Sequence, residues 1–289
     1  MARLLARFAT LATVLALLVP SAALGADPSY VALGDSYAAG PAIPMQIAPY
    51  GCAKSDHNYA HLAAPRLGEP AFRDPSCSGA KTDHMTTQQG VSPGPNPPQF
   101  DSLDADTRKV SLTIGGNDIG FSSIAEDCFS LTPAGSPTAP GGSPCKDKYT
   151  NADGSDEVSN RIAATAPKVA QVIQGIHSRS PLATVYVVNY SAILPHTGGG
   201  CWPQLPLAEG DVPWLRAKQV ELNQMLADQA AANSAALVDV YAASVGHDAC
   251  QLPTVRWVEP AAPSSPAAPV HPNIWGMQAM ADLLVTAAG

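Results

Sequence analysis

The chain has 289 residues, in which 16 lysines and arginines oppose 24 aspartates and glutamates to give a formal charge of −8. This negative balance is unfavourable for binding a polyanion, so we expect no nucleic-acid partner. Only 14% of the residues are charged and 28 are prolines, a composition typical of an exported protein with stiff loops. The length is sufficient for one substantial hydrophobic core.

Residues 1–26 have the pattern of a secretory signal peptide. Two arginines precede an apolar run at residues 8–19, and small residues surround the expected cleavage site near Gly25 or Ala26. The apolar run is short for a membrane span, so an uncleaved anchor is the less favoured alternative. We therefore expect a secreted protein, extracellular or in the cell envelope, with a single domain at residues 27–289.

Six cysteines follow the expected cleavage site, and an even count favours disulfides in an exported chain. None of them forms the Cys-x-x-Cys pair typical of zinc and dithiol redox sites. The short loop between Cys128 and Cys145 is rich in proline, glycine and serine, which favours the pairing of neighbours in order. The predicted disulfides are Cys52–Cys77, Cys128–Cys145 and Cys201–Cys250.

A pair of histidines is the only suggestion of a metal site. His57 and His61 are four residues apart and would share one face of a helix that Ser55 or Asp56 caps and that ends near Gly68. Two such histidines can bind a metal, but no third ligand is near them in the sequence. We expect neither a metal nor another cofactor.

Apolar runs that end in glycine or polar residues alternate with helical patterns. The expected strands are 30–34, 72–78, 110–114, 183–190 and 235–241, and the later helices are 156–178, 213–232 and one that continues to about 287. Pro167 would kink or divide the first of these helices. Residues 127–156 form an insertion of low hydrophobicity that two cysteines would hold as a loop. Strands that alternate with helices predict an α/β fold with a mainly parallel sheet.

The first expected strand leads directly to a serine. Residues 30–34 are followed by Asp35 and Ser36, and small residues occupy positions 38–40. A nucleophile at the carboxyl end of a buried strand has a fixed backbone, and small neighbours leave room for a substrate. The same Gly-Asp-Ser sequence is also an ordinary turn and helix cap, so it does not by itself predict catalysis.

Three further segments carry candidate site residues. Gly79 lies in Cys-Ser-Gly-Ala, Asn117 in Gly-Gly-Asn-Asp, and His271 in His-Pro-Asn before the terminal helix. Each is an ordinary turn or helix-start residue when taken alone. Together with Ser36, and in this order, they resemble the SGNH hydrolases, also called GDSL esterases and lipases. The cysteine intervals resemble those of secreted actinobacterial members with three disulfides.

The resemblance implies a fold and a mechanism. The fold would be a flavodoxin-like three-layer α/β/α sandwich with a central, mainly parallel sheet. Ser36 would attack an ester carbonyl, while His271 takes its proton and later gives it to the leaving alcohol. The backbone N–H groups of Ser36 and Gly79 and the side-chain amide of Asn117 would form the oxyanion hole.

One position departs from the family pattern. The family usually has an aspartate three residues before the histidine, where this sequence has Ala268, and no acidic residue lies between Glu259 and His271. Some secreted members orient the imidazole with a main-chain carbonyl. We therefore expect a serine–histidine dyad in which the carbonyl of Ala268 or Pro269 accepts from the imidazole. The alternative is that folding brings Asp248, Glu259 or another acid to the histidine.

The expected function is hydrolysis of carboxylic esters by a metal-independent serine esterase. The absence of a long apolar lid pattern slightly favours short or medium acyl chains. A carbohydrate O-acetyl esterase or a phospholipase would use the same site, and the alternative of another class is a catalytically weak or inactive envelope or glycan-binding protein. The expected partners are small-molecule, lipid or glycan esters, without integral membrane association, and the expected state is a monomer. The four tryptophans either line an acyl pocket or pack in the core.

Overall fold

The computed structural model describes residues 29–132 and 136–289, so the expected signal peptide at residues 1–26 lies outside the described residues. The central sheet has four strands in the order β1-β4-β5-β6. These strands are β1 (Tyr30–Gly34), β4 (Lys109–Thr113), β5 (Thr184–Val188) and β6 (Ala236–Val238). All neighbouring pairs are parallel, so their carboxyl ends meet at one edge of the sheet. The predicted mainly parallel sheet is confirmed.

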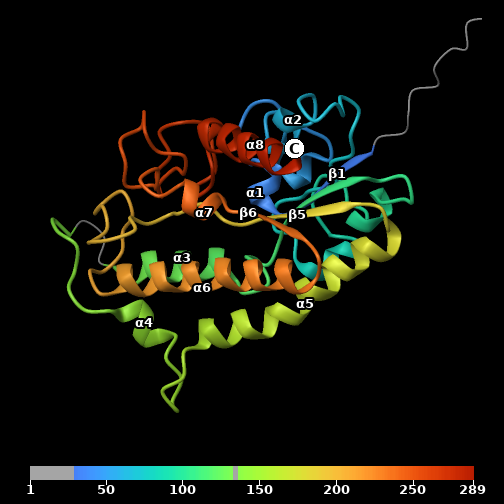
Figure 1. Cartoon of the computed structure of the whole chain (residues 1–289). Helices are drawn as coiled ribbons and strands as arrows, with labels where there is room; N and C mark the ends of the chain where they lie inside the picture. Colours follow the sequence, from blue (N-terminus) through green and yellow to red (C-terminus); the bar gives the residue numbers. More distant parts are fainter. Residues whose placement is uncertain (1–28, 133–135) are drawn as a thin grey trace, which may run out of the picture.

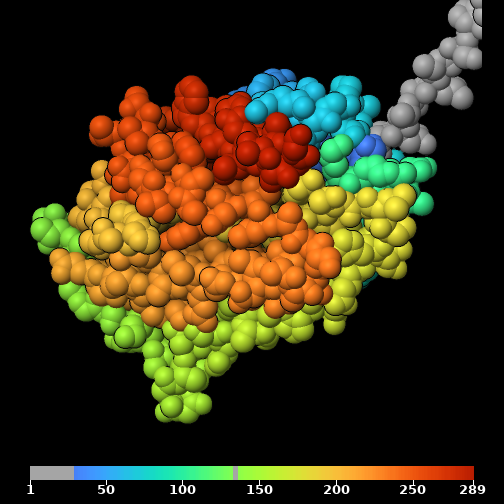
Figure 2. All heavy atoms as spheres, in the orientation of Figure 1, coloured from blue at the N-terminus to red at the C-terminus, as the bar shows by residue number. Residues whose placement is uncertain are grey.

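Helices cover both faces of the sheet (Figure 1). The long helices α5 (Glu157–Arg179) and α6 (Asp211–Ala232) lie on one face, and α2 (Tyr59–Ala63) and α8 (Ile274–Ala288) lie on the other. In the space-filling view, α8, in red, lies against the N-terminal part of the chain, in cyan (Figure 2). This arrangement confirms the three-layer α/β/α sandwich.

Strand β1 shows how the sequence divides the core between the two faces. Val31 and Leu33 belong to the hydrophobic cluster that includes the buried faces of α5 and α6, whereas Tyr30 and Ala32 belong to the cluster with α2 and α8. All four side chains are fully buried. Because successive side chains of a strand point to opposite faces, one continuous apolar run supplies both layers.

Shorter elements lie between the main ones. They are α1 (Ser36–Ala39), β2 (Gln46–Ile47), η1 (Tyr50–Cys52), β3 (Lys54–Ser55), η2 (Thr82–Met85), η3 (Gln99–Ser102), α3 (Phe121–Ser130), α4 (Pro144–Lys148) and α7 (Val240–Ala243). Strands β2 and β3 form a separate antiparallel pair. Within the described residues, no helix is long and apolar enough to span a membrane.

The expected strand at residues 72–78 is wrong in its extent. This segment forms a bridge to the edge of β1 at Arg73, and the N–H of Cys77 donates to the carbonyl of Gly34 at 3.0 Å, but no continuous ladder connects the two contacts. Beyond it, Pro75 has no N–H group to donate to a ladder. The N–H of Ser76 instead donates to the side chain of Asp74 at 3.0 Å. The segment therefore passes beside the sheet without forming a strand.

Helix boundaries also differ from those expected. Asn58, rather than Ser55 or Asp56, caps α2 by accepting from a backbone N–H, because Ser55 is already paired in β3. Helix α5 is continuous through Pro167. The insertion at 127–156 is not simply a loop, because it contains the end of α3 and all of α4.

Three disulfides connect the chain in the predicted pairs. The first closes the loop that leads to Gly79, the second joins α3 to α4, and the third joins the segment after β5 to the segment after α7. They are Cys52–Cys77, Cys128–Cys145 and Cys201–Cys250. Each cross-link of this kind typically adds about 3 kcal/mol to the free energy of unfolding.

Candidate active site

Ser36 is the first residue of α1, directly beyond the carboxyl end of β1. Gly34 ends the strand with φ +152°, and a Cβ atom there would lie 2.6 Å from the carbonyl oxygen of Thr113. Only glycine therefore fits this approach of two backbones. Asp35 caps α1 by accepting from the N–H of Tyr37 at 2.9 Å. The turn leaves Ser36 partly exposed at the end of the strand.

His271 lies in hydrogen-bond contact with Ser36. Its Nε2 atom is 2.8 Å from Ser36 Oγ, and its Nδ1 atom is 2.7 Å from the carbonyl oxygen of Pro269. Of the two carbonyls expected from the sequence, that of Pro269 faces the imidazole, whereas that of Ala268 accepts the backbone N–H of His271 at 3.2 Å. A carbonyl can only accept, so Nδ1 carries the proton and Nε2 is free to accept from the serine hydroxyl.

The surroundings of His271 favour its neutral form. Desolvation lowers the pKa of the imidazole below its ordinary value, and the hydrogen bond to the Pro269 carbonyl raises it in part. The net effect is a lowered pKa, so the imidazole is unprotonated near pH 7. A neutral imidazole is the form that can accept a proton from a hydroxyl group.

Asp248 and Glu259, the two acids that could have oriented His271, both bind other groups. Asp248 accepts from the N–H of Cys250 at 3.0 Å and from the side chain of Gln251 at 3.1 Å. Glu259 forms an ion pair with Arg256 at 2.7 Å. In residues 29–132 and 136–289, no carboxylate is hydrogen-bonded to the imidazole.

Glu259 nevertheless holds the loop that carries the histidine. Its carbonyl accepts the N–H of Val270, and its N–H donates to the carbonyl of His271, each at 3.0 Å. Its side chain also accepts from Asn273 Nδ2 at 2.8 Å. Burial opposes ionisation of Glu259, but the hydrogen bonds from Arg256 and Asn273 lower its pKa overall. This carboxylate therefore stabilises the loop in its charged form.

Asn117 and Gly79 belong to two turns that are joined by a hydrogen bond. Asn117 Nδ2 donates to the carbonyl of Ala80 at 3.0 Å, which leaves the second amide hydrogen unused. Gly79 has φ +79°, a conformation that suits glycine. Among the described residues, no acceptor lies opposite the backbone N–H groups of Ser36 and Gly79. These N–H groups are available to a ligand.

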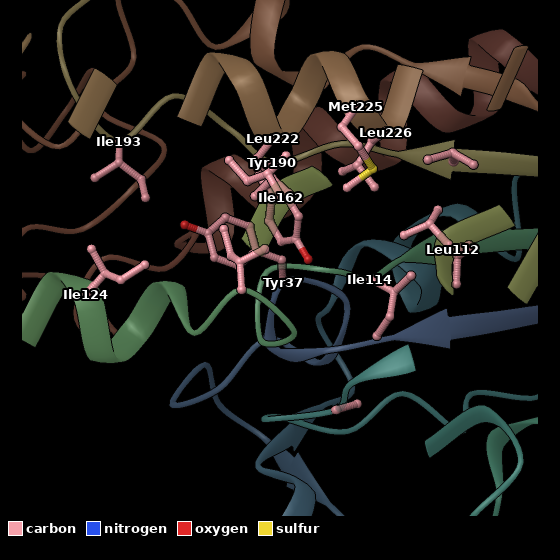
Figure 3. Packing of buried hydrophobic residues seen from close by; sticks show 14 of the residues in the cluster. Tyr37, Leu112, Ile114, Ile124, Ile162, Tyr190, Ile193, Leu222, Met225 and Leu226 are labelled. Carbon is pink, nitrogen blue, oxygen red and sulfur yellow. The ribbon is translucent and has the colours of Figure 1, made fainter. Parts of the chain in front are cut away.

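A pocket brings most of these groups together. Its lining includes Ser36, Asn117 and His271 but not Gly79, which is joined to it only through the turn of Asn117. The apolar part of the lining consists of Tyr37, Phe121, Tyr190, Ile193, Leu222 and Val270. Figure 3 shows Tyr37 and Tyr190 side by side, with Leu222 next to them. A serine hydroxyl in contact with a neutral imidazole, beside an apolar wall, would suit an ester of a hydrophobic acid.

Residues 32–279 match the GDSL-like Lipase/Acylhydrolase family. The chain belongs to this family. It is 40% identical over 258 residues to Lipase 2 of Streptomyces coelicolor. This match covers 88% of this chain and 83% of that protein. The family and this similarity show that the protein is a carboxylic ester hydrolase.

Two solved structures resemble this GDSL hydrolase over nearly their whole length. The extracellular lipase of Streptomyces rimosus is 26% identical with a TM-score of 0.71, and the match covers 89% of this chain and 98% of that one. Phospholipase A1 of Streptomyces albidoflavus NA297 is 26% identical with a TM-score of 0.72, and the match covers 91% and 100%.

In this GDSL hydrolase, two tyrosines connect the nucleophile turn to the other site loops. The hydroxyl of Tyr190 donates to Asp35 Oδ2 at 2.5 Å and accepts from the N–H of Gly116 at 2.8 Å. The hydroxyl of Tyr37 donates to the carbonyl of Val270 at 2.7 Å. The nucleophile turn is thus hydrogen-bonded both to the turn after β4 and to the histidine loop.

Asp35, at the centre of these contacts, is buried and forms no ion pair with any described residue. Burial raises its pKa to about 7, although hydrogen bonds from Tyr190 and from the N–H of Tyr37 lower it. Tyr190 was not predicted as a site residue. The available signal was its position two residues beyond β5, since the carboxyl ends of parallel strands share one edge of the sheet.

Proposed function

We propose that the protein is a secreted serine esterase that forms an acyl-enzyme on Ser36 with His271 as general base. The observation that carries this proposal is the 2.8 Å contact between His271 Nε2 and Ser36 Oγ, in a pocket that both residues line. The lowered pKa of His271 supports the role of base. The Pro269 carbonyl, rather than an acid, would orient the imidazole, which makes the pair a dyad.

In the first step, Ser36 Oγ attacks the ester carbonyl carbon while its proton passes to His271 Nε2. The oxyanion accepts hydrogen bonds from the N–H groups of Ser36 and Gly79 and from the Asn117 amide. Loss of one such donor typically costs about 3 kcal/mol of transition-state stabilisation. The tetrahedral intermediate then collapses, and the alcohol leaves with the proton from Nε2.

In the second step, the same base activates water. Water attacks the acyl carbon of the Ser36 ester, gives a proton to His271 Nε2, and the serine recovers that proton as the carboxylic acid leaves. The Pro269 carbonyl accepts from Nδ1 in both steps. A neutral carbonyl stabilises the imidazolium less than a carboxylate would, so the dyad relies more on the oxyanion donors.

The setting of this enzyme is also part of the proposal. The signal-peptide pattern at residues 1–26 and the three disulfides support secretion of a single domain at residues 27–289, which we propose acts as a monomer. The similarity to the structure described as an extracellular lipase agrees with this location. Similarity to a phospholipase A1 favours glycerophospholipid esters as a second candidate substrate class beside simple short and medium acyl esters.

The decisive experiment compares wild type, Ser36→Ala and His271→Ala on a short nitrophenyl ester. Each substitution is expected to lower kcat/KM by at least about 10³-fold. A fluorophosphonate should label wild type at Ser36 and leave Ser36→Ala unlabelled, with circular dichroism as the control for folding. The non-catalytic alternative would be established instead by two results. Folded wild type would be neither labelled nor active, and wild type and Ser36→Ala would bind glycans equally well.

A further inference from the structure

A loop at residues 89–96 is closed by one antiparallel bridge between its two ends. The N–H of Gln89 donates to the carbonyl of Asn96 at 2.9 Å, and the N–H of Asn96 donates to the carbonyl of Gln89 at 3.0 Å. The loop is also fastened to the chain beside the first disulfide, because the N–H of Gly51 donates to the carbonyl of Pro93 at 3.1 Å. These contacts hold the two ends of the 89–96 loop in fixed positions.

The side chains of both bridge residues donate to the segment that leads to Gly79. Gln89 Nε2 donates to the carbonyl of Ser78 at 2.8 Å, and Asn96 Nδ2 donates to the carbonyl of Pro75 at 3.0 Å. Gln89 is 5% exposed and Asn96 is 3% exposed. Water does not readily replace a hydrogen bond at such a depth, so the 89–96 loop fixes the orientation of these two carbonyls.

The Ser78 carbonyl belongs to the same peptide group as the N–H of Gly79, and this peptide bond is trans. In a planar trans peptide the C=O and N–H bonds point in opposite directions. Gln89 occupies the carbonyl side, so the Gly79 N–H points away from Gln89, where no acceptor among the described residues meets it. A Cβ atom on Gly79 would lie 3.6 Å from Gln89 Nε2, so the glutamine packs directly against the turn.

The hydrogen bond from Gln89 acts on the peptide group in two ways. The carbonyl of Ser78 can only accept, so the amide of Gln89 must present Nε2 to it. Within the described residues this is the one hydrogen bond of the side chain, because Oε1 is buried without a partner. Consecutive hydrogen bonds polarise one another, so a donor on the carbonyl makes the N–H of the same peptide group a stronger donor.

We propose that Gln89 is a positioning residue of the oxyanion hole, which aims and polarises the Ser78–Gly79 peptide group. This inference rests on the proposed acyl-enzyme at Ser36. Gln89 is not part of the lining of the catalytic pocket and therefore acts through the Gly79 N–H. Asn117 Nδ2 holds the next carbonyl, that of Ala80, at 3.0 Å, so the turn is fixed on both sides of Gly79.

The experiment compares wild type with Gln89→Met, which keeps a side chain of similar length and removes the donor. With nitrophenyl butyrate, kcat should fall at least about tenfold while KM changes less than about twofold, since full loss of one oxyanion donor costs about 10²–10³ in kcat. The Ki of an alkyl boronic acid, which forms a tetrahedral adduct on the serine, should rise by a similar factor. Gln88→Met, at the exposed neighbouring position, is the matched control and should equal wild type.

Two further readouts separate positioning from a structural role. The acid limb of the pH profile of kcat/KM should not move in Gln89→Met, because Gln89 contacts the Ser78 carbonyl and not His271. Gln89→Asn is one methylene shorter and loses the contact with a polar side chain, so it should show the same fall in kcat and carries the test where Gln89→Met does not fold.

Two results would overturn the inference. One is a kcat within about twofold of Gln88→Met in folded Gln89→Met or Gln89→Asn, and the other is a lowered kcat with an unchanged Ki for the boronic acid. Failure of the proposed function looks different, because Ser36→Ala would then hydrolyse the butyrate ester as fast as wild type whatever the Gln89 variants do.

Discussion

Asp35 and Glu259 are both buried carboxylates beside the candidate active site, but their hydrogen-bond partners differ in charge and their pKa values shift in opposite directions. Asp35 is 1% exposed, and its donors among the described residues are neutral, the Tyr190 hydroxyl and the Tyr37 N–H, so burial raises its pKa to about 7. Glu259 is 0% exposed but meets Arg256, and its hydrogen bonds lower its pKa. The hydrogen bonds from Arg256 and Asn273 thus favour the charged form of Glu259, whereas burial favours the neutral form of Asp35.

Both carboxylates form hydrogen bonds that hold loops in place, and neither is hydrogen-bonded to the imidazole within the described residues. Asp35 caps α1 and so fixes the nucleophile turn, and Glu259 pairs with the histidine loop through its backbone and its side chain. In the proposed dyad, these acids support two loops that meet at Ser36 and His271, and a peptide carbonyl completes the site. We therefore expect substitution of either acid to change the free energy of unfolding more than it changes proton transfer between Ser36 and His271.

Glu259→Gln should produce the largest effect. The substitution leaves the guanidinium of Arg256, 5% exposed, without its counter-charge, so the free energy of unfolding should fall by about 3–5 kcal/mol. Guanidinium chloride unfolding measures this loss. The control is the double variant Glu259→Gln with Arg256→Met, which removes the unpaired charge and should recover part of the stability. Equal stability of Glu259→Gln and wild type would show that the ion pair does not support the loop.

Asp35→Asn should change how stability depends on pH. The pKa of Asp35 is raised from 3.8 to about 7 on folding, so its contribution is fully present below pH 3.8 and is lost as pH rises toward 7. An amide cannot ionise, so the variant should gain up to about 4 kcal/mol relative to wild type between pH 4 and pH 8. Unfolding in urea at both pH values measures the difference. A stability difference that is constant with pH would mean that folding does not raise the pKa of Asp35.

Tyr190→Phe should have an intermediate effect. The lost hydroxyl leaves Asp35 Oδ2 and the N–H of Gly116 without a partner, which should lower the free energy of unfolding by about 1–3 kcal/mol. Because Gly116 precedes Asn117, kcat for a short ester should also fall while KM changes little. Tyr50→Phe, at a side chain that is 63% exposed, is the control and should match wild type in both measurements. A change in KM alone would place Tyr190 in substrate binding instead.

Local chemistry made several features predictable. Apolar runs that end in Gly-Asp-Ser and Gly-Gly-Asn predicted β1 and β4 and the common edge at which Ser36 and Asn117 lie. The missing aspartate at Ala268 predicted a carbonyl partner for the imidazole, and the structure narrows the two candidates to Pro269. The strand inferences depend on residues that are close in sequence and on a rule of parallel sheets, whereas the carbonyl partner was implied by the resemblance to secreted members of the family.

Features that depend on tertiary packing were not predictable in the same way. The Tyr190–Asp35 contact joins residues 155 apart, and nothing local to either residue names the other. The apolar cavity beside the catalytic pocket is lined by side chains of α3, α6, the segment after β5 and the histidine loop, and each of these segments alone has the pattern of ordinary core. The segment at 72–78 has a strand-like sequence, but the turn at Asp74 and Pro75 prevents it from forming a continuous strand.

Asp248→Asn should have the smallest effect, and it gives the sharpest test of the dyad. Asp248 binds Cys250 and Gln251 rather than His271, so kcat/KM for a short ester should stay within about twofold of wild type. The pH profile supplies a second readout. Because desolvation lowers the pKa of His271, kcat/KM should rise with pH through an apparent pKa below 6.5 and then level off.

The same profile separates the dyad from a hidden triad. A carboxylate beside the imidazole would stabilise its protonated form and move the acid limb above 6.5, the ordinary pKa of His271. Replacing that carboxylate by an amide would then lower the apparent pKa of the acid limb. It would also lower the rate by several orders of magnitude. Asp248→Asn, and Glu259→Gln under conditions in which it is folded, should leave the limb where it is in wild type. A limb that moves in either variant would identify that residue as the acid of a triad.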